Sequence, residues 1–71
     1  MTFKIGGKTI ENATSVDDAI LRYYADSLGA TVVSDSEGNI DIGATFNVDS
    51  TGVDSIKTQA QAAVDAISQD V

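Results

Sequence analysis

FKIGGKTI, at residues 3–10, is the stretch that decides the fold of this 71-residue chain. It contains two short runs of alternating apolar and polar residues, joined by two glycines that readily adopt the positive φ angles of a two-residue hairpin turn. In this register Phe3 lies opposite Ile10, and Ile5 lies opposite Lys8. We therefore expect an antiparallel hairpin that buries Phe3, Ile5 and Ile10 on one face and exposes the alternate positions.

An amphipathic helix is predicted after the hairpin. The Ser15 side chain can cap the amide of Asp18, and Asp17 and Asp18 would occupy the positive first turn of a helix that begins at Val16. Gly29 supplies a C-terminal stop. The expected apolar stripe consists of Val16, Ala19, Ile20, Leu21, Tyr23, Tyr24 and Leu28, and the expected solvent face carries Asp18, Arg22 and Asp26.

A second hairpin and a second helix are predicted in the remaining chain. Residues 31–34 and 40–46 have the composition of strands, and the turn at residues 35–39 contains Gly38. Asp49 or Ser50 would cap a final helix of about 18 residues. Its apolar stripe would be Val53, Ile56, Ala60, Ala63, Val64, Ile67 and Val71.

These elements together predict an α+β fold. Residues 1–71 would form a single domain, because a chain of this length has room for only one core. The order ββαββα is most economically arranged as a two-layer sandwich, in which a short antiparallel sheet carries both helices on one face.

The composition excludes several classes of function. The chain has no histidine and no cysteine, which excludes Ser-His-Asp and Cys-His catalysis and structural zinc sites. The acidic turn around Gly38 resembles a calcium loop, but the first and twelfth ligand positions would be Val33 and Ala44, so an ordinary turn is favoured. We therefore expect no enzyme activity, no cofactor and no metal. The N-terminal segment lacks the apolar core of a secretory signal, and we expect a cytoplasmic protein.

The charge favours a basic partner. Eleven acidic residues against four basic ones give a net charge of −7, which opposes direct binding to nucleic acids and to anionic membranes. Aspartate has a short side chain with few rotamers, so many aspartates present fixed negative points that can imitate the phosphates of a nucleic acid. The alternative interpretation is that the charge serves solubility alone.

In its size, its acidity, its lack of cysteine and its mixed αβ order, the chain resembles small phage-encoded inhibitors. These proteins, which include anti-CRISPR proteins, occupy the nucleic-acid-binding sites of host defence complexes. The resemblance extends over the whole chain but involves no sequence motif, and it therefore assigns no residues. It implies a non-enzymatic inhibitor that acts by protein–protein interaction.

The leading hypothesis is an acidic binding protein that occupies a basic, nucleic-acid-binding surface of a partner protein, as a monomer or small homo-oligomer. The predicted partner-binding residues are Asp17, Asp18, Asp26, Asp35, Glu37 and Asp41. The alternative is a small assembly protein that pairs with a second copy through its C-terminal helix. Val53, Ala60 and Ile67 are seven residues apart and would form the seam.

Overall fold

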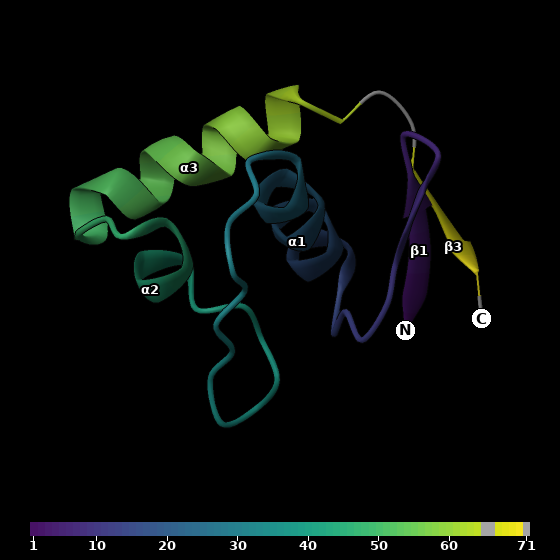
Figure 1. Cartoon of the computed structure of the whole chain (residues 1–71), viewed down its shortest axis with the longest axis horizontal. Coiled ribbons are helices and arrows are strands. Elements are labelled where there is room, and N and C mark those ends of the chain that lie inside the picture. Colours follow the sequence, from purple (N-terminus) through teal and green to yellow (C-terminus); the bar gives the residue numbers. More distant parts are fainter. Residues whose placement is uncertain (65–66, 71) are drawn as a thin grey trace.

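The structure of the chain is a computed structural model that describes residues 1–64 and the backbone of residues 67–70. Figure 1 shows its helices and strands, which are β1 (Thr2–Ile5), β2 (Lys8–Ile10), α1 (Val16–Ser27), α2 (Ile42–Phe46), α3 (Ser50–Ala62) and β3 (Ile67–Asp70). The strands form an antiparallel sheet in the order β2-β1-β3. The α+β class is confirmed, whereas the predicted order ββαββα is wrong, because the described elements run ββαααβ.

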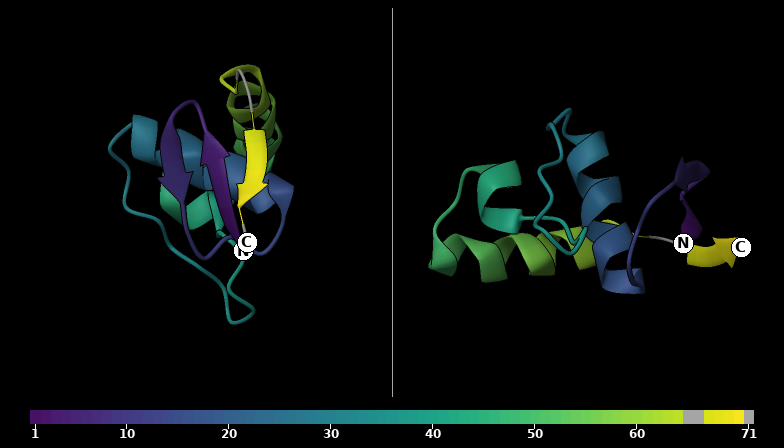
Figure 2. Two further views of the ribbon diagram at one scale, coloured as in Figure 1. Left: turned by 90° about the vertical axis from the view of Figure 1, so that its right-hand side faces the viewer. Right: turned by 90° about the horizontal axis from the view of Figure 1, so that it is seen from below.

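The first hairpin is confirmed in its register and in its buried face. Phe3 pairs with Ile10 and Ile5 pairs with Lys8. Both turn glycines have positive φ angles, 55° and 82°. Phe3 and Ile5 are almost fully buried. The left panel of Figure 2 shows β1 in the centre of the sheet, with β2 and β3 at its edges.

Helix α1 begins and ends where the sequence predicts. The Ser15 side chain accepts a hydrogen bond from the amide of Asp18, 3.1 Å away, and Gly29 follows the helix with a φ angle of 72°. Four predicted positions are wrong. Asp18 is buried and the Arg22 side chain is only 14% exposed, so neither lies on the solvent face. Val16 and Leu28 are 48% and 59% exposed rather than part of the core. The buried face of α1 is therefore rotated toward Asp18.

The predicted second hairpin is wrong. A single bridge between Ser34 and Ile40 remains of it, and residues 42–46 form α2 instead of a strand. The Asp41 side chain accepts a hydrogen bond from the amide of Ala44 at 3.1 Å, which caps the first turn of α2. This local capping competes with strand pairing and explains why the apolar alternation of residues 40–46 does not produce a strand.

Helix α3 begins as predicted but ends early. The Asp49 side chain accepts a hydrogen bond from the amide of Gly52 at 2.9 Å, and the helix ends at Ala62. Ile67 lies in β3, opposite Ile5, where the backbone of β3 pairs with an edge of β1. Its place in the predicted helical stripe is therefore wrong, and that of Val71 lies outside the described residues.

The layers also differ from the predicted sandwich. Helix α1 contacts β1 and β2 on one side and α2 and α3 on the other, so it lies between the sheet and the other two helices. The prediction that both helices cover one face of the sheet is therefore wrong for α3.

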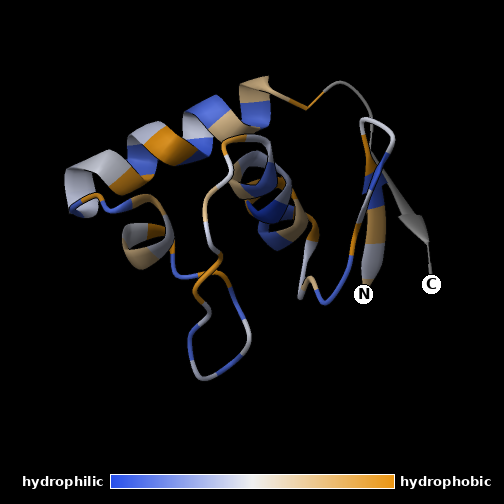
Figure 3. Cartoon of the chain, viewed as in Figure 1, coloured by the Kyte–Doolittle hydropathy of each residue, from blue (hydrophilic) through white to orange (hydrophobic). Residues whose placement is uncertain are grey.

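Figure 3 shows apolar positions spread over the hairpin, α1 and α3. The buried apolar core consists of Phe3, Ile5, Ile10, Ala13, Ala19, Ile20, Leu21, Ala25, Ile40 and Ala60.

Candidate functional site

The carboxylate of Asp18 joins three segments of the chain. One oxygen, Oδ2, accepts hydrogen bonds from the amide of Thr14 at 2.9 Å and from Nε of Arg22 at 2.7 Å. The other, Oδ1, accepts a hydrogen bond from the amide of Ile40 at 2.7 Å. Burial by itself raises the pKa of Asp18, but these donors and the charge of Arg22 together hold the pKa below its ordinary value. Asp18 therefore stays ionised and is engaged inside the protein.

Arg22 extends this connection to residues 34–41, which we call the acidic loop. Its Nη2 atom donates hydrogen bonds to the carbonyl of Gly38 at 2.7 Å and to Oγ of Ser34 at 3.3 Å. The Arg22 side chain is 14% exposed. Arg22, which is itself paired with Asp18, therefore attaches the acidic loop to α1 through these two hydrogen bonds.

The acidic loop is also held by its own hydrogen bonds. Oδ1 of Asp35 accepts hydrogen bonds from the amides of Glu37 at 2.9 Å and Asn39 at 3.0 Å. The Thr14 hydroxyl donates a hydrogen bond to Oδ1 of Asn39. Figure 1 shows the loop projecting from the body of the molecule, below α1. Asp35 and Glu37 are both exposed there.

Asp26 lies at the other end of α1, nine residues after Asp17, which is about 13 Å along a helix. It forms an ion pair with Nζ of Lys8 at 2.8 Å. The hydrogen bond to Asp26 raises the pKa of Lys8 above its ordinary value. Lys8 also lies 5.9 Å from the centroid of the Tyr23 ring. This pair connects the hairpin with α1.

The structure thus separates the six predicted partner-binding residues into different environments. Asp17 is exposed in the first turn of α1, next to the residues that hold the acidic loop. Asp35 and Glu37 lie on that loop, and Asp41 ends it as the cap of α2. Asp18 is internal and Asp26 is paired with Lys8. Of the six, Asp17, Asp35 and Glu37 are exposed, form no ion pair in the described residues and cap no helix, and we call these three residues the candidate acidic surface.

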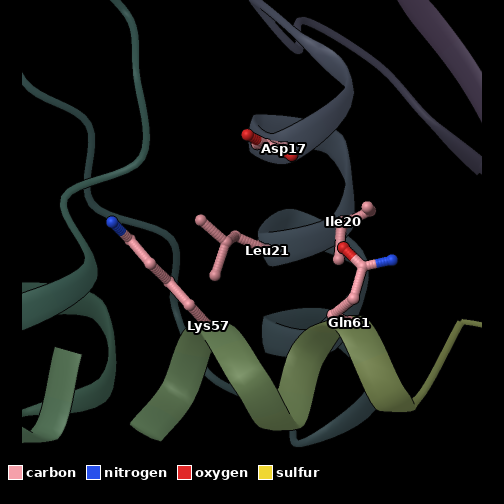
Figure 4. A pocket seen from close by; sticks show the side chains of 5 residues that line it. All are labelled: Asp17, Ile20, Leu21, Lys57 and Gln61. Carbon is pink, nitrogen blue, oxygen red and sulfur yellow. The ribbon is translucent and has the colours of Figure 1, made fainter. Parts of the chain in front are cut away.

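A pocket that the sequence did not predict lies between α1 and α3. Its volume is about 230 Å³, and Figure 4 shows its lining residues, Asp17, Ile20, Leu21, Lys57 and Gln61. Lys57 and Gln61 are four residues apart and share one face of α3. This spacing is the only sequence signal for the pair, because the packing of α3 against α1 creates the pocket.

Two further observations limit the chemistry of the described residues. Residues 1–64 and 67–70 contain no group of three acidic, histidine or cysteine side chains that could hold a metal ion. Within the same residues, no helix is long and apolar enough to span a membrane.

No protein-family model, curated protein or solved structure matches the chain.

Proposed function

We propose that the chain is a non-enzymatic binding protein whose acidic surface occupies a basic, nucleic-acid-binding surface of a partner protein. The net charge of −7 supports this function, because it attracts a basic protein surface over distances longer than a direct contact. The resemblance to phage-encoded inhibitors of host defence complexes favours a partner of this class.

The observation that carries the proposal is the anchored acidic loop. Arg22 is engaged by Asp18 and by the loop backbone, so it holds the loop in place, and Asp35 and Glu37 are exposed on that loop. In the described part of the chain, no cation forms an ion pair with either carboxylate. A loop backbone held in this way loses little conformational entropy when a partner binds.

Two of the three residues predicted for the assembly seam do not lie on an exposed helical face in the described structure. Ala60 is fully buried against the protein's own core, and Ile67 belongs to a strand. Helix α3 instead uses its apolar face to pack against α1 and α2. The described structure therefore favours the acidic binding protein.

The test is a pull-down from a bacterial lysate at low and high salt, with the wild type and two variants as baits. The first variant is Asp17→Asn, Asp35→Asn and Glu37→Gln, which lowers the net charge from −7 to −4. Asparagine keeps the side-chain oxygen that Asp35 uses inside the loop. We expect the wild type to retain a nucleic-acid-binding protein at low salt and to release it at high salt.

The matched control carries Glu11→Gln, Asp49→Asn and Asp54→Asn, three exposed positions outside the candidate acidic surface. It has the same net charge of −4, and asparagine remains a good cap for α3. We expect the first variant to lose the partner and the control to retain it. Equal retention by the two variants would show that net charge, rather than this surface, determines binding.

A further inference from the structure

The pocket between α1 and α3 carries charges of both signs around an apolar floor. Ile20 and Leu21 form the floor and are themselves almost completely buried, with 5% and 7% of their surface exposed. In Figure 4 the Leu21 side chain lies between Asp17, which comes from α1, and Lys57, which rises from α3. Gln61 lines the side near Ile20.

Among residues 1–64, the polar side chains of the pocket are not engaged in side-chain contacts. In residues 1–64, the side chains of Asp17, Lys57 and Gln61 form neither a hydrogen bond nor an ion pair, although Asp17 and Lys57 line the same pocket. Lys8 and Arg22 differ from Lys57 in this respect, because each is paired with an aspartate. A ligand could therefore use both charges of the pocket without breaking an existing contact.

The volume limits the size of the ligand. Pockets for drug-sized molecules usually have volumes of about 300–1,000 Å³, whereas this one has about 230 Å³. A single amino acid is of a suitable size, and its ammonium and carboxylate groups match the two opposite charges at the rim. A ligand with only one charge would pair with either Asp17 or Lys57. The other of these two residues would then lie beside the ligand without a counter-ion.

We propose that this pocket binds an aliphatic α-amino acid in its zwitterionic form. The ammonium group contacts the Asp17 carboxylate, the carboxylate contacts the Lys57 ammonium, and the aliphatic side chain rests on Ile20 and Leu21. This proposal does not rest on the acidic binding function, although both sites use Asp17. Exposed ion pairs are individually weak, so the dissociation constant falls in the millimolar range.

The test is a titration of the ¹⁵N-labelled protein, followed through the amide chemical shifts. The probes are L-leucine, the cation leucinamide and the anion N-acetyl-leucine, all three with the same aliphatic side chain. We expect saturable shifts with L-leucine at Ile20, Leu21, Lys57 and Gln61, and markedly weaker binding of the two singly charged probes. The absence of localised shifts with L-leucine, or binding of leucinamide as tight as that of L-leucine, would overturn the proposal.

Single substitutions sharpen this test. Asp17→Asn and Lys57→Gln should each weaken L-leucine binding about fivefold, which corresponds to the loss of one exposed ion pair. Asp54→Asn on α3, outside the pocket, is the matched control and should leave the affinity unchanged. If Lys57→Gln strengthens leucinamide binding and leaves L-leucine binding unchanged, the pocket accepts cations and the zwitterion proposal is wrong.

Discussion

The substitution Asp18→Asn tests the connection between α1 and the acidic loop. Both carboxylate oxygens accept hydrogen bonds in the folded protein, from Thr14 and Arg22 at one oxygen and from Ile40 at the other. Asparagine has an NH₂ group in place of one of these two oxygens. At least one N–H group that donates to Asp18 would therefore face another donor and lose its hydrogen bond. The substitution also leaves the largely buried guanidinium of Arg22 without its counter-ion.

The magnitude follows from these lost contacts. Removing one partner of a buried ion pair typically costs about 3–5 kcal/mol, and the 14% exposure of Arg22 places this case at the lower end, about 3 kcal/mol. A single small core without disulfides or metals is expected to supply only about 3–5 kcal/mol of stability. We therefore expect Asp18→Asn to be largely unfolded or only marginally folded at 25 °C.

The neighbouring residue provides the control. Asp17→Asn makes the same chemical change one position away, at an exposed side chain, and should alter the free energy of unfolding by no more than about 0.5 kcal/mol. Urea unfolding followed by far-ultraviolet circular dichroism measures both variants. If the two variants differ by less than about 1 kcal/mol, the Asp18 contacts are not the structural connection described above.

Three further predictions concern acid, packing and an aromatic contact. The pKa of Asp18 is lowered in the folded state, so its stabilising contribution is complete above the unfolded pKa of about 3.9. This contribution is lost as the pH falls through the folded pKa, and acid unfolding measured by circular dichroism should show the loss. Gly52→Ala should lower the melting temperature, despite the better helix propensity of alanine, because the new Cβ would lie 2.6 Å from Cβ of Val48; an unchanged or higher melting temperature would contradict this. Tyr24→Phe removes the exposed 3.0 Å hydrogen bond to Gln59 and should cost under about 1 kcal/mol in urea unfolding, whereas Tyr24→Ala should cost several times more; equal costs would show that the ring contributes little.

Local chemistry accounts for the elements that the sequence predicted well. The two-glycine turn fixes the register of the hairpin, and the Ser15 cap fixes the start of α1. Both features depend on residues within a few positions of each other. The same applies to the start of α3 at Asp49.

The wrong predictions arose where distant segments or competing local bonds decide the structure. The burial of Asp18 depends on the amide of Ile40, which lies 22 positions away, and no local pattern indicates it. Residues 42–46 have the alternation of a strand, but the Asp41 cap stabilises a helix too short to show its own periodicity. The pocket residues Lys57 and Gln61 were missed because the site forms only when α3 packs on α1.

The most direct test of the proposed function is a displacement measurement. A nucleic-acid-binding protein recovered in the pull-down is mixed with its fluorescently labelled DNA or RNA, and this chain is titrated into the complex while the anisotropy is recorded. The proposed function predicts that the wild type releases the nucleic acid, and that the variant Asp17→Asn, Asp35→Asn, Glu37→Gln does so much less effectively than the charge-matched control. An unchanged anisotropy with the wild type, or equal release by the two variants, would contradict it.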